Sequence, residues 1–194
     1  MGCPYLGSMH RIECRYRRVP ELLPLRRGML SIGETAPTFQ LTAQDKSKFD
    51  SREHEGSRLV VVFYPAAFTG VCTEEMCTFT DLTADLENSG CVVVGISVDA
   101  PFSNAAFAKQ NNIPFPLLSD VHRSVINSFG IPYNDFVIEG YTVATRSVFV
   151  IDPDGKISYA WAAENPGVQP NYESVISHCP VSYTHLTLPT IVSV

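Results

Sequence analysis

Two short runs of apolar residues restrict the possible folds more than any other feature of the chain: LVVVFY at 59–64 and CVVVGISV at 91–98. Both have the length of a strand and lack the alternation of a half-exposed strand, which is typical of parallel strands buried on both faces. Between them, apolar residues recur at spacings of three and four over 73–87, which predicts a helix. The three segments together predict a right-handed βαβ unit.

The segments on either side of this unit add further strands and helices. Two alternating runs around polar turn residues predict a hairpin over 38–51. A helix is predicted over 101–110, with an apolar face formed by Phe102, Ala105 and Ala106. The later patterns predict a strand within 115–120, a helix over 121–129 between the cap residue Asp120 and Gly130, strands over 147–151 and 156–162, and a helix opening at Asn171. The sequence thus predicts an α/β fold, with a central mixed sheet flanked by helices and an N-terminal hairpin.

Charge and composition argue against two classes of partner. The 194 residues carry a formal net charge of −6 and a pI near 5.3, which argue against a nucleic-acid-binding surface. No apolar run approaches the roughly 18 residues of a membrane-spanning helix, so we expect no membrane partner. Six cysteines are too few for a disulfide scaffold in a chain of this length, and no secretory signal is visible. We therefore expect a cytoplasmic protein, in whose reducing surroundings paired cysteines are more often catalytic or metal-binding than structural.

The two ends of the chain differ from its middle. Residues 1–28 contain six arginines and two glutamates, whereas the remainder has a net charge of about −10. We interpret 1–28 as a non-native or disordered extension, the alternative being a basic targeting arm. Near the other end, VSYTHLTLPT resembles a translated sequencing adaptor. We therefore expect one domain over 29–178 with a truncated C-terminal helix, and a non-native tail over 179–194, the alternative being an extended strand.

The segment FYPAAFTGVCTEEMC, at 63–77, places Cys72 shortly after a buried strand and at the start of a helix. Functional sites in open α/β sheets lie at the carboxyl ends of strands. A cysteine reacts as the thiolate, whereas a free cysteine with a pKa near ~8.5 is mostly protonated at neutral pH. The free N–H groups of a helix N-terminus favour the anion, and a nearby arginine would add a permanent cation. Arg146, just before the strand SVFVI, is the candidate cation, the alternative being a solvated surface arginine.

Three residues around Cys72 allow two interpretations each. Thr69 could hydrogen-bond a bound oxygen atom, or bond to its own backbone. Pro65 could stiffen and shield the loop, or simply end the strand. Glu75 could orient Arg146, or be a first-turn acid stabilised by the helix dipole.

The combination of these residues resembles a known family. PAAFTGVC matches the Pro-x-x-x-Thr-x-x-Cys motif of peroxiredoxins, and the similarity continues through GISVDAPFSNAAFA, FPLLSD and RSVFVIDPDGKI, over roughly 29–178. It is nearest to the Q-type (bacterioferritin-comigratory) and E-type members. The resemblance implies a thioredoxin-like fold and a thiol-dependent peroxidase that reduces hydrogen peroxide and organic hydroperoxides without a metal or other cofactor. It assigns Pro65, Thr69, Cys72 and Arg146 to the active site, with Cys72 as the peroxidatic cysteine that is oxidised to a sulfenic acid. It also implies an antioxidant enzyme with a thioredoxin- or glutaredoxin-like reductant, and it allows a homodimer.

Cys77 has two interpretations. Q-type peroxiredoxins carry a resolving cysteine five residues after the peroxidatic one, and Cys77 has this spacing from Cys72. Five residues of helix separate two Cα atoms by roughly 8–9 Å, whereas a disulfide needs about 4.4–6.8 Å. A disulfide between the two cysteines therefore requires the first helical turn to unwind. Alternatively, Cys77 is structural, and the chain is a one-cysteine peroxidase or a redox sensor.

Two other classes fit the cysteine pattern less well. A thioredoxin-like disulfide reductase usually has C-x-x-C, which is absent. A zinc site on Cys72 and Cys77 lacks a convincing second pair of ligands, so we expect no metal.

Overall fold

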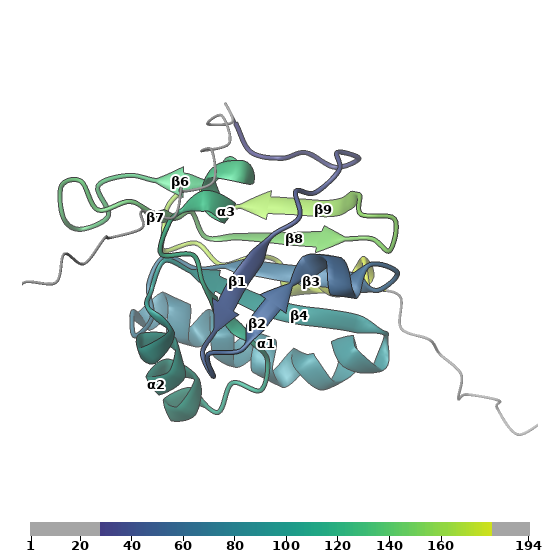
Figure 1. Cartoon of the computed structure of the whole chain (residues 1–194), viewed down its shortest axis with the longest axis horizontal. Coiled ribbons are helices and arrows are strands. Elements are labelled where there is room, and N and C mark those ends of the chain that lie inside the picture. The colour runs from purple at the N-terminus through teal and green to yellow at the C-terminus, as the bar shows by residue number, and fades with distance from the viewer. Residues whose placement is uncertain (1–27, 180–194) are drawn as a thin grey trace, which may run out of the picture.

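A computed structural model describes residues 28–179 of the chain, and the predictions for 1–27 and 180–194 lie outside the described residues. The described part contains a seven-stranded sheet in the order β2-β1-β5-β4-β3-β8-β9 (Figure 1). Its strands are β1 (Gln40–Ala43), β2 (Lys48–Asp50), β3 (Arg58–Phe63), β4 (Cys91–Ser97), β5 (Leu117–Ser119), β8 (Ser147–Ile151) and β9 (Ile157–Ala162). A separate two-stranded sheet joins β6 (Pro132–Tyr133) to β7 (Val143–Ala144), and the sequence patterns did not predict it.

The central sheet is mixed, as predicted. Strands β3 and β4 run parallel, with Leu59 opposite Val92, and helix α1 (Gly70–Asn88) connects them. Strand β8 runs antiparallel to β3, and β9 antiparallel to β8. The predicted hairpin is present as the antiparallel pair of β1 and β2. The βαβ unit and the hairpin are therefore confirmed.

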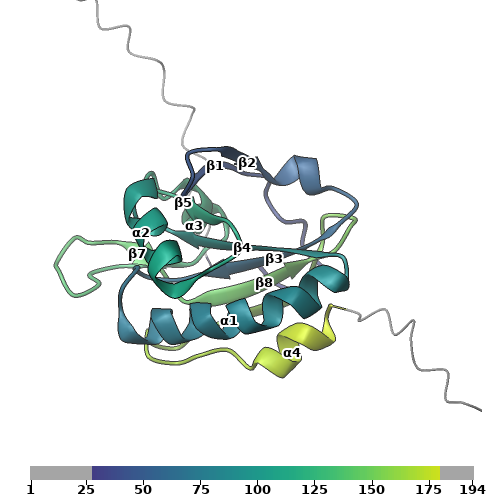
Figure 2. The same ribbon diagram turned by 90° about the horizontal axis from the view of Figure 1, so that it is seen from below.

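Helices cover both faces of the sheet (Figure 2). One hydrophobic cluster joins a face of the sheet to α1, α2 (Pro101–Asn111) and α4 (Tyr172–Ser177), and α1 and α4 lie side by side in Figure 2. A second cluster on the opposite face includes Val125 and Ile126 of α3 (Ser124–Ser128). None of the helices within 28–179 is long and apolar enough to cross a membrane.

Helix α1 begins earlier than its apolar pattern indicated. The pattern predicts a start at Thr73, whereas the helix begins at Gly70, with Thr69 as the extended N-cap residue. The reason is that Gly70, Val71 and Thr73 are not buried, so the first turn contributes no apolar periodicity. Cys72 consequently lies inside the first turn of the helix.

Two other predictions needed correction. The apolar face predicted for α2 is wrong, because Phe102 is 70% exposed and the buried residues are Asn104, Phe107 and Ala108. Helix α3 begins at Ser124 instead of residue 121, because the Asp120 carboxylate accepts hydrogen bonds from the amides of the fifth and sixth residues after it.

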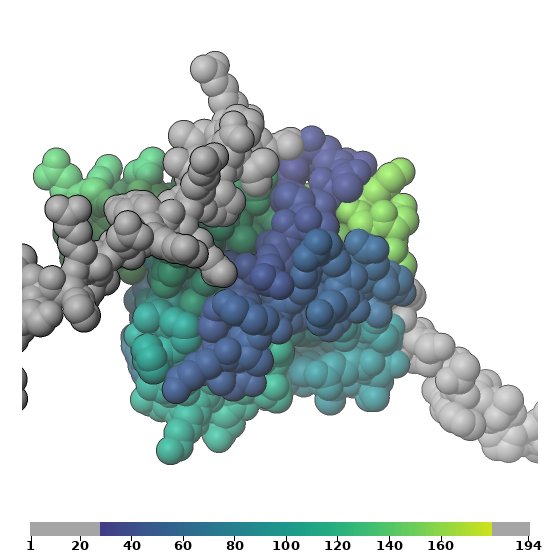
Figure 3. All heavy atoms as spheres, viewed as in Figure 1, coloured from purple at the N-terminus to yellow at the C-terminus, as the bar shows by residue number. Residues whose placement is uncertain are grey.

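One cavity of the described part lies away from Cys72. Its volume is about 330 Å³, and Leu59, at the start of β3, and Ile151, at the end of β8, are among its lining residues. Segments 35–39, 51–59 and 151–155 surround it, and their purple, blue and lime atoms meet toward the right of Figure 3. Cys72 follows the other end of β3, so the cavity and the cysteine lie at opposite ends of that strand.

Candidate active site

Cys72 lies at the carboxyl end of β3, as predicted. A loop over 64–69 connects the strand to α1, and the cysteine is the third residue of the helix. Its side chain is fully buried, and its thiol is free. The helix N-terminus therefore directs unpaired N–H groups, with their partial positive charge, toward the surroundings of the sulfur.

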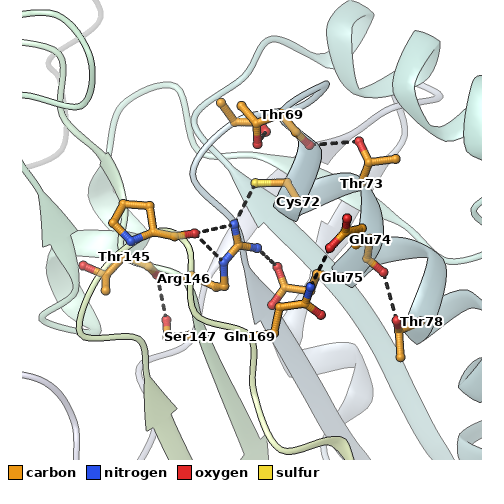
Figure 4. A network of polar contacts seen from close by, with 12 residues as sticks. Thr69, Cys72, Thr73, Glu74, Glu75, Thr78, Thr145, Arg146, Ser147 and Gln169 are labelled. Atoms are coloured by element: carbon orange, nitrogen blue, oxygen red, sulfur yellow. Dashed lines mark hydrogen bonds and ion pairs between the residues drawn. The ribbon is translucent and has the colours of Figure 1, made fainter.

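Arg146 is the residue just before β8, and its side chain reaches Cys72. Its Nη2 donates to Cys72 Sγ over 3.2 Å, and the guanidinium is 1% exposed (Figure 4). The Nε and Nη2 groups also donate to the carbonyl oxygen of Pro166, over 3.2 and 3.0 Å. Arg146 is therefore a buried cation in contact with the sulfur, and the alternative of a solvated surface arginine is wrong.

Glu75 is the carboxylate partner of this cation. Its Oε2 accepts from Arg146 Nη1, and the carboxyl is fully buried. Burial raises the pKa of Glu75 to about 7, although the charge of Arg146 acts in the opposite direction. Burial lowers the pKa of Arg146, but the charges of Glu75 and Cys72 outweigh this effect and raise it overall. Glu75 Oε1 has no hydrogen-bond partner, so the pair is only partly satisfied.

Thr69 and Pro65 lie in the loop that precedes the cysteine. The Thr69 hydroxyl donates to the carbonyl oxygen of Ala66 over 3.2 Å, which is the local backbone bond considered from the sequence. The Thr69 carbonyl accepts from the amide of Thr73 over 2.9 Å, and so closes the first turn of α1. Pro65 is buried, which fits a shielding position beside the site.

Cys77 lies further along the same helix and is half-buried with a free thiol. The helix is continuous from Gly70 to Asn88, so both cysteines are held at helical spacing. That spacing is too long for a disulfide. Cys72 and Cys77 therefore remain apart while the first turn is intact.

Sequence reasoning missed one polar contact of the site. The carbonyl of Pro166 accepts two hydrogen bonds from Arg146 and orients its guanidinium. Any residue can supply a backbone carbonyl, so the sequence contains no signal for this role. Within the described residues no group of three or more His, Cys, Asp or Glu side chains could hold a metal ion.

Comparison with known proteins shows which family this chain belongs to. The family model described as AhpC/TSA family matches residues 32–160. The chain belongs to the AhpC/TSA family. A peroxiredoxin candidate of Mycobacterium tuberculosis is 41% identical to this AhpC/TSA chain over 133 residues, which are 68% of this chain and 84% of the relative. Peroxiredoxin Bcp of Escherichia coli is 36% identical over 68% of this chain and 85% of its own length.

Solved structures agree with the family assignment. The crystal structure of the peroxidoxin BcpB of Mycobacterium tuberculosis superposes with a TM-score of 0.64 at 32% identity, covering 70% of this chain and 88% of that one. A peroxiredoxin-like protein of Aquifex aeolicus gives a TM-score of 0.70 at 26% identity over 78% of this chain and 86% of its own. The peroxiredoxin resemblance and the thioredoxin-like fold are thereby confirmed. This AhpC/TSA protein is a thiol-dependent peroxidase related to the Bcp and peroxiredoxin Q enzymes.

Proposed function

We propose that Cys72 is the peroxidatic cysteine of this enzyme and that Arg146, Thr69 and Pro65 complete its active site. One observation carries the assignment: the Arg146 guanidinium donates to Cys72 Sγ over 3.2 Å inside a buried setting at a helix N-terminus. Reactive cysteines are characteristically found in such surroundings, beside a cation and at a helix N-terminus. Cys91 and Cys179 are also free and buried. Neither lies at the N-terminus of a helix, so neither has the surroundings of Cys72.

The proposed reaction begins with attack by the Cys72 thiolate on one oxygen of a peroxide. The sulfur–oxygen bond forms as the O–O bond breaks, so the sulfur is oxidised to a sulfenic acid and the peroxide is reduced. The departing oxygen takes up a proton and leaves as water from hydrogen peroxide, or as an alcohol from an organic hydroperoxide. Arg146 stabilises the negative charge as it moves from sulfur to oxygen. Glu75 holds Arg146 in place from the helix side.

Resolution by Cys77 is the second part of the proposal. Its thiol attacks the sulfenic sulfur, a disulfide forms, and water is released. The first turn of α1 must unwind for this step, because the intact helix keeps the two Cα atoms too far apart. A thioredoxin- or glutaredoxin-like dithiol then reduces the disulfide. A reducing compartment such as the cytoplasm would supply such a reductant.

Peptide mass spectrometry tests both parts. The reduced protein is treated with one equivalent of hydrogen peroxide, free thiols are alkylated after denaturation, and the peptides are mapped. We expect a Cys72–Cys77 disulfide, with Cys91 alkylated as an internal control. Sulfenic or sulfinic acid on Cys72 with Cys77 alkylated would support the one-cysteine alternative. Absence of any selective change at Cys72 would refute the assignment itself.

A further inference from the structure

The loop before α1 holds a strained backbone. Phe68 has a φ of 65°, in the left-handed region that is unfavourable for a bulky residue. Its ring is half-exposed and contacts Phe107 of α2 edge-on, with the ring centroids 5.2 Å apart. A strained residue persists only where its neighbours hold it in place. The anchors of this loop therefore decide whether the first turn of α1 stays formed.

Asp99 provides one such anchor. It follows β4, and its Oδ2 accepts a hydrogen bond from the amide of Ala67 over 2.8 Å. The same oxygen lies 3.0 Å from the hydroxyl of Ser97, whose side chain is fully buried. The carboxylate thus fixes the residue immediately before the strained Phe68.

A buried amide holds the other side of the loop. The Tyr64 hydroxyl donates to Asn104 Oδ1 over 2.9 Å, and both side chains are fully buried. Asn104 Nδ2 donates to the Ser119 hydroxyl over 3.2 Å, and Asn104 Oδ1 lies 3.3 Å from the Ser97 hydroxyl. This network explains why a polar residue occupies the buried face of α2. Asp99 joins this network through the Ser97 hydroxyl, and its carboxylate contacts the backbone of the loop at Ala67.

We propose that Asp99 is a positioning residue that keeps the loop and the first turn of α1 in the conformation in which Cys72 reacts with peroxide. Breaking the Ala67–Asp99 bond frees the loop, and Thr69, whose carbonyl closes the first turn, moves with it. Asp99 therefore sets how often this turn opens. The inference rests on the proposed function, because the opened turn is the one that a Cys72–Cys77 disulfide requires.

The test compares three variants of the full chain. Asp99→Ala removes the acceptor, and Asp99→Asn keeps an acceptor oxygen without the charge. Asp45→Ala is the matched control, because Asp45 Oδ1 also accepts from a loop amide, that of Ser47 over 2.9 Å, in the β1–β2 turn. Hydrogen exchange of peptides covering 66–76 is measured by mass spectrometry in the reduced state. The rate constant of Cys72 oxidation by hydrogen peroxide is measured alongside.

We expect Asp99→Ala to raise exchange in 70–76 about tenfold and to slow Cys72 oxidation by a similar factor, because the Ala67 amide loses its acceptor. Asp99→Asn should stay near the unmodified protein, and Asp45→Ala should change neither readout. Exchange in peptides of β3 and β4 should not move. The proposal is overturned if exchange in 70–76 is unchanged in Asp99→Ala, or rises equally across the sheet. Failure of the proposed function gives a different result, namely no oxidation of Cys72 in the unmodified protein, and the exchange data still judge Asp99.

Discussion

Arg146 satisfies three different partners with one planar group. Its guanidinium contacts the Cys72 sulfur, the Glu75 carboxylate and the Pro166 carbonyl at the same time. A lysine ammonium could supply the charge, but it lacks the fixed fork of donors that reaches all three. The geometry of the donors, in addition to the charge, therefore distinguishes arginine at this position.

Substitution of Arg146 separates these two contributions. We expect Arg146→Gln to slow the oxidation of Cys72 by peroxide roughly a hundredfold, as for removal of a buried donor at a reacting centre. Arg146→Lys should fall between this variant and the unmodified protein. Stopped-flow measurement of the second-order rate constant checks both. Arg58→Gln serves as the control, because Arg58 pairs with Asp152 over 2.8 Å at the far end of β3. Equal rates for Arg146→Lys and the unmodified protein would show that the fork of donors has no role.

Helix α1 is anchored by its middle and its carboxyl half. Met76, Phe79 and Leu86 are buried against the sheet, whereas Gly70, Val71 and Thr73 of the first turn are not buried. Four threonine hydroxyls of α1 donate hydrogen bonds to the backbone carbonyls four residues earlier, and such bonds slightly destabilise a helix. The four residues are Thr73, Thr78, Thr80 and Thr83. The helix therefore relies on packing. Cys72 is the buried residue of its first turn, so the proposed unwinding would break few other core contacts.

Substitution of Cys77 tests the proposed resolving role, which requires the first turn to unwind. Cys77→Ser keeps a small polar side chain at a half-buried position, so we expect the helix and the rate of Cys72 oxidation to be preserved. The sulfenic acid should then persist, and excess peroxide should convert it to sulfinic acid. Mass spectrometry over a peroxide titration measures the sulfinic fraction. Cys91→Ser is the control, and it should behave as the unmodified protein does. If Cys77→Ser is no more prone to sulfinic acid than the unmodified protein, the resolving role is wrong.

The elements of this fold could be predicted where the signal is local. The apolar runs at 59–64 and 91–98 place β3 and β4 within one residue of their bounds. The contacts that assemble the site are not local. Asp99 binds the amide of a residue 32 positions earlier, and Pro166 offers only a carbonyl. The sequence pattern did not predict that Asn104 is buried, because a polar residue is ordinarily exposed. Its burial is explained by its hydrogen-bond partners on three other segments.

The Arg146–Glu75 pair also links the site to the stability of the whole molecule. It joins α1 to the start of β8 through the core, with side-chain exposures of 1% and 0%. A buried ion pair costs desolvation energy that its mutual attraction only partly returns, and here one carboxylate oxygen has no partner. The folded protein therefore retains a destabilising element beside Cys72, and perturbed ionisable groups of this kind are often found at functional sites.

This element predicts how the free energy of unfolding changes with pH. Because the pKa of Glu75 rises from 4.5 to about 7 on folding, the folded state binds more protons than the unfolded state between these values. The stability from neutral Glu75 is thus fully present below pH 4.5 and is lost as the pH rises toward 7, by at most about 1.4 kcal/mol per pH unit. Glu75→Gln cannot ionise, so we expect its stability relative to the unmodified protein to increase over that window.

Urea unfolding of both proteins at several pH values between 4.5 and 7.5 measures this difference. Taking the difference removes the contributions of other shifted groups. Asp50, whose pKa falls to about 2, acts with the opposite sign but below this window. Burial raises the pKa of Asp120, and its effect is common to both proteins. A difference that stays constant from pH 4.5 to 7 would mean that Glu75 is already ionised throughout. In that case the charge of Arg146 outweighs the cost of burying the carboxylate.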